Sequence, residues 1–135
     1  MAWHAADPAK LEFEERDPRE GEAEGRRLAD LTTALELKQS RARLWRYPPH
    51  TTGRRHADKA QEEVFVVLSG TLTMLLGDPP KRVDLGAGGV VAVDPGTTLQ
   101  VRNETDDELV LYVYGAPPEQ AGADFFDDVP LPLRG

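Results

Sequence analysis

The chain has 135 residues and a mass of 14.9 kDa, which suits one folded domain and is too little for two well-packed cores. Its net charge of −8 argues against general binding to nucleic acids or to anionic membranes. The absence of cysteine excludes disulfides, thiol nucleophiles and zinc fingers. No apolar run is long enough to span a membrane and no signal-peptide pattern opens the chain, so we expect a cytoplasmic protein.

The beginning of the chain is strongly polar. Residues 10–27 carry twelve charged side chains, and their apolar side chains are only Leu11, Phe13 and Ala23. Such a segment buries too little apolar surface to offset the conformational entropy that ordering would cost. We therefore expect residues 1–27 to form a charged arm that is mobile or laid on the surface.

A short amphipathic helix is predicted next, over residues 28–37. Leu28, Leu31 and Leu35 recur at helical spacing and would share one face. Asp30 is a candidate N-cap for the turn that follows it.

From Arg41 onward, short runs rich in β-forming residues alternate with turn residues. The runs are 41–47, 63–68, 71–76, 81–85, 90–93, 98–102 and 108–114. Glycine, proline, asparagine and aspartate separate them, and no helical pattern lies between them. This spacing predicts an all-β antiparallel sandwich or small barrel over residues 28–115 and disfavours a parallel βαβ arrangement.

Two features predict how the outside of this barrel is covered. The tail 116–135 is acidic and contains prolines, and we expect Phe125 and Phe126 to dock it on the barrel. In run 63–68 the inward set would be Glu63, Phe65 and Val67, yet the other set is also apolar. A strand that is apolar on both faces is covered on both, by the opposite sheet or by another subunit, so we expect a homodimer.

Polar residues before and within the second run follow a specific spacing. His50 is followed by His56, Asp58, Glu63 and Gly70, with five, one, four and six residues in the gaps. This is similar to the first motif of the cupin superfamily, G-x5-H-x-H-x(3,4)-E-x6-G. His50 stands at the place of the first glycine and Asp58 at the place of the second histidine.

A second motif follows in the same register and order. Gly88, Asp94, Gly96, Leu99 and Asn103 stand at the places of the named residues in the cupin pattern G-x5-P-x-G-x2-H-x3-N. The chain therefore resembles the cupin superfamily over about residues 41–115. The resemblance implies a double-stranded β-helix, or jelly-roll barrel, that is open to a pocket at one end.

The resemblance also implies a metal site of three histidines and a glutamate, of which this sequence keeps only part. His56 and Glu63 remain, Asp58 is a shorter substitute, and Leu99 replaces the fourth ligand by hydrocarbon. One imidazole and two carboxylates favour manganese or iron over zinc. The alternative is that no metal is bound and that the three groups are satisfied by hydrogen bonds to each other, to arginine or to water. We expect either no metal or a weakly held divalent cation.

Strand 41–47 contributes to the pocket through one of its two faces, which brings in either Arg46 or Tyr47. We expect the pocket to be lined by Arg46, Tyr47, Phe65, Leu99 and Val101. Seven lysines and arginines lie between residues 38 and 59, against one acid. They form either an exposed basic edge or a positive rim that attracts a carboxylate or phosphate.

Four functions are compatible with these residues. The favoured one is a small cupin that binds a small anionic organic ligand with weak or no metal binding. The second is a metal-dependent oxygenase or isomerase that uses His56, Asp58 and Glu63. The third is a metal-free, epimerase-like enzyme with His56 as the base, and the fourth is a structural or interaction module.

Overall fold

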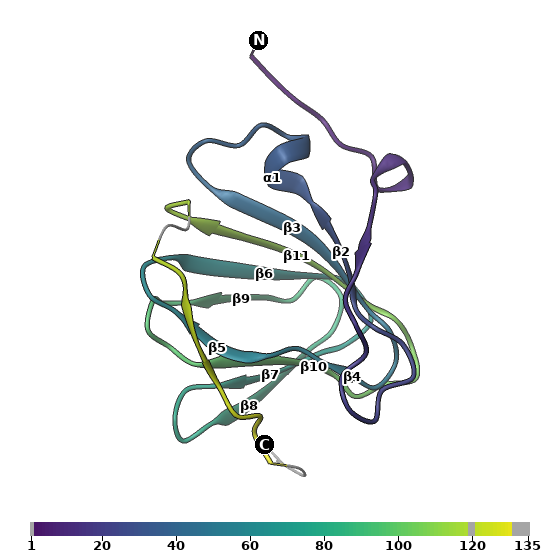
Figure 1. The fold of residues 1–135 in the computed structure, drawn as a ribbon, viewed down its shortest axis with the longest axis vertical. Helices are drawn as coiled ribbons and strands as arrows, with labels where there is room; N and C mark the ends of the chain where they lie inside the picture. Colours follow the sequence, from purple (N-terminus) through teal and green to yellow (C-terminus); the bar gives the residue numbers. More distant parts are fainter. Residues whose placement is uncertain (1, 119–120, 131–135) are drawn as a thin grey trace.

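Two antiparallel sheets face each other in the computed structural model, which describes residues 2–118 and 121–130 (Figure 1). The first sheet contains, in spatial order, β1 (Glu14–Glu15), β2 (Arg27–Asp30), β3 (Arg41–Tyr47), β11 (Leu109–Ala116), β6 (Glu62–Ser69) and β9 (Val90–Val93). The second contains β12 (Ala123–Phe126), β5 (Arg55–Asp58), β10 (Leu99–Asn103), β7 (Leu72–Leu76) and β8 (Lys81–Leu85), with β4 (Thr51–Thr52) paired to β10. The predicted all-β barrel is confirmed. In the described residues, no helix is long and apolar enough to cross a membrane.

The inward faces of the two sheets make the core. On β6 the inward set is the predicted one, since Phe65 and Val67 are buried while Leu68 is 51% exposed. The buried cluster between the sheets also contains Leu72, Met74, Leu99, Leu109, Leu111 and Val113. Burial of these side chains supplies the main driving force that holds the sheets together.

The short helix predicted over residues 28–37 is present as a single turn, and the start of this segment is a strand instead. Residues 27–30 instead form β2, in which Leu28 and Ala29 pair with Trp45 and Leu44 of β3. Helix α1 is a single turn, Leu31–Ala34, and the predicted cap is correct because the Asp30 carboxylate accepts a hydrogen bond from the Thr33 N–H. Pairing with β3 buries Leu28 and Ala29 together, and it therefore outweighs the helical spacing of the leucines.

The charged arm lies along the outside of the first sheet. Strand β1 pairs with β2, and Leu11 and Phe13 pack with Leu44 on the outer face. The half of this face formed by β6 and β9 is less covered, and Val90 is 57% exposed there. The expected homodimer stays a prediction, and this apolar half is where a second copy would pack.

Motif residues hold the turns of the barrel. Gly70 has a φ of 81°, and a Cβ there would overlap the carbonyl oxygen of Glu108. The buried Asn103 amide donates hydrogen bonds to the carbonyl oxygens of Tyr47, Pro48 and Asp107. His50, at the place of a motif glycine, keeps a left-handed φ of 56°. The motif therefore preserves backbone geometry even where its residue type has changed.

The tail returns to the second sheet as β12, beside β5 (Figure 1). Beyond β12 the buried Val129 is held through its backbone, since its N–H donates to Gln100 and its carbonyl accepts from Arg102. Arg19 of the arm pairs with Asp128 at 2.8 Å. The tail therefore docks through β12 and Val129, while the rings of Phe125 and Phe126 stay about half exposed.

Candidate functional site

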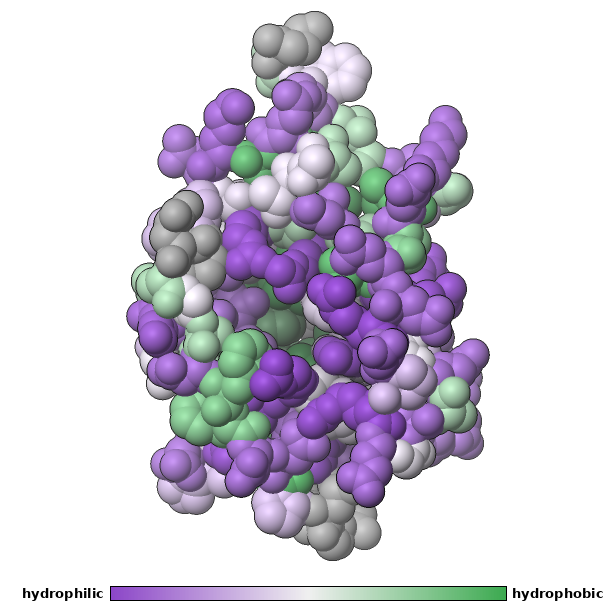
Figure 2. All heavy atoms as spheres, viewed as in Figure 1, coloured by the Kyte–Doolittle hydropathy of each residue, from purple (hydrophilic) through white to green (hydrophobic). Residues whose placement is uncertain are grey.

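A cavity of about 520 Å³ lies between the two sheets and opens to solvent. Figure 2 shows the hollow, with hydrophilic residues around it and hydrophobic residues deeper inside. Its floor includes Phe65, Leu99, Val101, Leu111 and Val113, which belong to the core. The barrel is thus filled at one end and hollow at the other.

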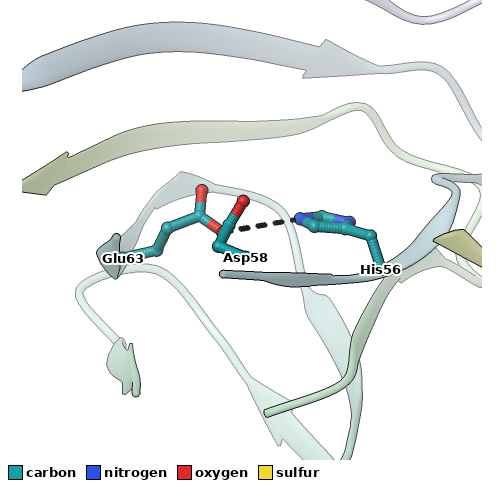
Figure 3. Close-up of side chains that lie close together, drawn as sticks. All are labelled: His56, Asp58 and Glu63. Atoms are coloured by element: carbon teal, nitrogen blue, oxygen red, sulfur yellow. Dashed lines mark ion pairs between the residues drawn. The ribbon is translucent and has the colours of Figure 1, made fainter. Parts of the chain in front are cut away.

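Three chemically active side chains converge at one side of this cavity (Figure 3). His56 and Asp58 alternate on the same face of β5, and Glu63 begins the inward face of β6 after a short loop. The Nε2 atom of His56 lies 3.5 Å from a Glu63 carboxylate oxygen and 3.8 Å from one of Asp58. The predicted convergence of these three residues is therefore present.

The orientation of the imidazole follows from its other nitrogen. Nδ1 of His56 lies 3.1 Å from the carbonyl oxygen of Arg54, which can only accept, so Nδ1 carries a proton and donates it. Nε2 consequently faces the two carboxylates. A lone pair at Nε2 would be repelled by them, so the arrangement requires either a proton on Nε2 or a cation between the groups.

Both partners of the His56–Glu63 pair have shifted pKa values. Burial acts to lower the pKa of His56, but the hydrogen bond with Glu63, the Arg54 carbonyl and the two carboxylate charges raise it overall. Burial acts to raise the pKa of Glu63, but hydrogen bonds with His56 and Asp58 and the charges of His56 and Arg43 lower it overall. The proton therefore belongs on the imidazole and the negative charge on Glu63.

The same cluster can be tested as a metal site. One ligand atom from each of His56, Asp58 and Glu63 lies within 4.8 Å of the others, and the buried Oε1 of Glu63 has Nε2 of His56 at 3.5 Å. Leu99, which pairs directly with His56 across β5 and β10, is 1% exposed and supplies no donor. A nitrogen and two carboxylates fit a hard divalent cation that keeps open positions.

The other wall of the cavity is basic and aromatic. Arg41, Arg43, Trp45 and Tyr47 form the inward face of β3, and all four line the cavity. Arg26 reaches in from the arm, with its guanidinium 5.2 Å from the ring centre of Trp45 and 5.6 Å from that of Tyr47. These contacts are within the range of cation–π attraction.

Most of these arginines lack an acidic partner. Among the described residues, no carboxylate oxygen lies within 4 Å of a guanidinium nitrogen of Arg26, Arg41, Arg43 or Arg54. Arg54 instead covers the ring of Phe125 at 3.9 Å, and Phe125 also lies 6.0 Å from the His56 ring. The tail thus contributes a ring to the mouth of the cavity.

Four of the five pocket residues expected from the sequence line the cavity, and one does not. Tyr47, Phe65, Leu99 and Val101 line the cavity. The expectation for Arg46 is corrected, because it lies on the outer face of β3, where it donates to Glu108 at 2.9 Å and lies 5.1 Å from the Phe13 ring. Alternation along β3 places Arg46 and Tyr47 on opposite faces, and the buried Tyr47 takes the inner one.

The sequence placed Arg41 and Arg43 only within the basic segment 38–59, as part of an exposed edge or a positive rim, and it did not assign Arg26 or Phe125 to the pocket. Arg41 and Arg43 are on the same face of β3 as Tyr47. Strand alternation therefore places them in the cavity once Tyr47 is known to face inward. Arg26 and Phe125 come from the arm and the tail, and no local pattern in either segment places them at the cavity.

The cupin domain family model matches residues 43–115. No curated protein matches the chain. The chain is similar to several solved structures, each of which shares its fold at low sequence identity.

A sugar phosphate isomerase from a cupin superfamily of Silicibacter pomeroyi is 21% identical, with a TM-score of 0.72 over 90% of this chain and 91% of that one. A predicted oxalate decarboxylase from Thermotoga maritima is 18% identical, with a TM-score of 0.72 over 84% and 98%. A double-stranded β-helix protein from Klebsiella pneumoniae is 20% identical, with a TM-score of 0.67 over 83% and 90%. At these identities the similarity establishes the fold alone.

Proposed function

Because the chain belongs to the cupin family and its barrel is hollow and lined with arginines, we propose that it binds a small organic anion in this cavity. The observation that carries the proposal is that Arg26, Arg41, Arg43 and Arg54 face the cavity without a carboxylate partner among the described residues. Arg26, Arg41 and Arg43 are half-buried, and a cation held away from bulk water is costly unless an opposite charge compensates it, whereas Arg54 is exposed.

The charge of the whole chain strengthens this argument. With 24 acidic residues against 16 basic ones, carboxylates are abundant, yet the cavity is lined by five arginines and only two carboxylates. The cavity is therefore locally positive within an acidic protein. A ligand with a carboxylate or phosphate would receive charge-assisted hydrogen bonds there, while its carbon skeleton would contact the aromatic and aliphatic floor.

The proposal can be tested with a reporter inside the cavity. The chain has two tryptophans, Trp3 and Trp45, and only Trp45 lines the cavity, so Trp3→Phe leaves one local fluorophore. A panel of small organic acids is titrated against the emission of Trp45, beside the neutral amide of each acid. We expect saturable changes for some acids and none for their amides. Equal responses to acids and amides, or no response to any acid, would overturn the proposal.

A second candidate function is supported by the three donors within 4.8 Å at His56, Asp58 and Glu63. We infer a weakly held divalent cation, manganese or iron rather than zinc, bound through Nε2 and the two carboxylates. Such a cation would act as a Lewis acid that polarises an oxygen of the bound ligand. Metal analysis of the purified protein, with His56→Ala as the comparison, tests it. Metal that is retained equally by both proteins would contradict this site.

A further inference from the structure

Two of the unpaired arginines lie side by side. Arg41 and Arg43 are two residues apart on the inward face of β3, which spaces their Cα atoms by roughly 7 Å. Their cross-strand partners on β11 are Gly115, which has no side chain, and the short Val113. On β2, Arg43 is opposite Asp30, whose carboxylate instead accepts hydrogen bonds from the N–H and the hydroxyl of Thr33. Both guanidinium groups line the cavity.

The guanidinium groups of Arg41 and Arg43 repel each other, and among the described residues no acid within 4 Å offsets this repulsion. Burial, followed by the positive charges of Arg41 and Arg16, lowers the pKa of Arg43 overall, although the charges of Glu63 and Asp30 act to raise it. Neither acid lies within 4 Å of Arg43. Two like charges in a partly buried position repel each other more strongly than they would in water.

Other arginines among the described residues form ion pairs with acidic side chains. Arg46, on the opposite face of the same strand, pairs with Glu108, and Arg82 pairs with Asp84 and Glu104. These pairs show that the fold supplies acids to arginines on its outer surface. The unpaired state of Arg41 and Arg43 is thus particular to the cavity.

We infer that Arg41 and Arg43 form a subsite for a doubly charged oxyanion group of the cavity ligand, a phosphate ester or a pair of carboxylates. The inference rests on the proposed function and specifies it. One carboxylate would leave the second guanidinium uncompensated, whereas a dianion accepts hydrogen bonds from both. Glu63 is in the same row of the first sheet as Arg41, with Gly115 between them, and Asp58 lies on the facing sheet. Both carboxylates repel negative charge, so the dianionic end lies at the two guanidinium groups and the remainder of the ligand extends toward His56.

Simple anions test this subsite. In the Trp3→Phe protein, Trp45 emission is titrated with sulfate as a tetrahedral dianion, malonate as a dicarboxylate and acetate as a monoanion, all at one ionic strength. We expect sulfate or malonate to bind at least about tenfold more tightly than acetate, because two charge-assisted contacts replace one. Whichever of the two dianions binds more tightly identifies the ligand group as phosphate-like or dicarboxylate.

Variants then locate the binding. Arg41→Gln and Arg43→Gln should each weaken binding of the dianion by at least about tenfold and so remove the preference for the dianion over acetate. Arg46→Gln is the matched control, since it makes the same charge change on the same strand but on the outer face. Folding of each variant is checked by its thermal transition.

The outcomes separate the two proposals. Acetate that binds as tightly as the dianions, with saturable Trp45 changes, would overturn the dianion subsite and leave the organic-anion proposal standing. No response to any organic anion would overturn both. A dianion preference that Arg46→Gln abolishes as fully as Arg43→Gln would assign the effect to overall charge and would also overturn the subsite.

Discussion

Leu99 and His56 are direct partners across the antiparallel strands β10 and β5, so a buried hydrocarbon side chain lies beside the imidazole of the candidate site. The cupin pattern has a histidine where this chain has Leu99. Because the backbone position is retained and only the side chain differs, the missing donor can be restored without moving a strand.

We predict that Leu99→His increases affinity for Mn²⁺ by at least about tenfold, since it adds an imidazole to one nitrogen and two carboxylates. Calorimetric titration with MnCl₂ measures the change. Leu99→Met is the control, because it keeps an apolar side chain of similar size. Equal Mn²⁺ affinity in the histidine and methionine variants would show that position 99 does not face the cation.

The His56–Glu63 pair predicts a window of pH in which it stabilises the fold. The raised pKa of His56 means that its contribution is complete below the ordinary value of 6.5 and is lost as the pH rises through the folded-state pKa. The lowered pKa of Glu63 means that its contribution is complete above 4.5 and is lost as the pH falls through the folded-state pKa. The pair therefore contributes most between these two ordinary values.

Thermal melts in EDTA from pH 4 to pH 9 measure this effect as the difference in Tm between the unmodified protein and Glu63→Gln. We expect the largest difference within that window and a smaller one on either side. Glu62→Gln, which removes the same charge from an exposed neighbour on the same strand, is the matched control and should give only a small difference. A difference for Glu63→Gln that is constant across the range would contradict the pair.

His50 predicts a stabilising substitution. Its φ of 56° is unfavourable for a residue with a Cβ, and its contact with Asp106 is an exposed one. His50→Gly should raise the free energy of unfolding by about 1 kcal/mol, because glycine adopts this backbone conformation without the steric penalty. Chemical denaturation measures the change, with His50→Ala as the comparison. A glycine variant no more stable than the alanine variant would contradict the argument.

The exposed half of the outer face predicts self-association. Leu68 and Val90 are 51% and 57% exposed on the neighbouring strands β6 and β9. We expect light scattering to give twice the chain mass of 14.9 kDa, and Val90→Glu to give the single mass. Ala9→Glu places the same charge on an exposed residue of the arm and should leave the dimer intact. If light scattering gives the single chain mass for the unmodified protein, the prediction of a dimer is wrong.

Strand positions were largely predictable from the sequence. Runs 41–47, 81–85 and 90–93 coincide with β3, β8 and β9, because turn residues mark both ends of each run. Strand β5 is absent from the predicted β-rich runs, since three of the four residues of Arg55–Asp58 are polar or charged, and only the spacing of His56 and Asp58 indicated a strand there. Side chains of this strand line a cavity that opens to solvent, and they are therefore polar. A strand with polar inward side chains lacks the apolar alternation by which strands are recognised in a sequence.

The site itself was predictable in part. The spacing of His56, Asp58 and Glu63 anticipated their convergence, because two alternate positions on one strand and the start of the next inward face depend only on short-range geometry. The inner face of β3 was not predictable, since both of its faces carry arginine and apolar residues. The arm and the tail reach the cavity through contacts between distant parts of the chain, which no local pattern encodes.

The cavity wall is therefore built partly from the region that the family pattern covers and partly from the segments that flank it. The family pattern covers residues 43–115, but Arg16 and Arg26 enter from before it and Phe125 from after it. Under the proposed function, substitutions in these two flanking segments would alter which anions are accepted while every turn and core contact of the barrel is preserved. Selectivity for the proposed ligand could then evolve in these segments, independently of the barrel framework.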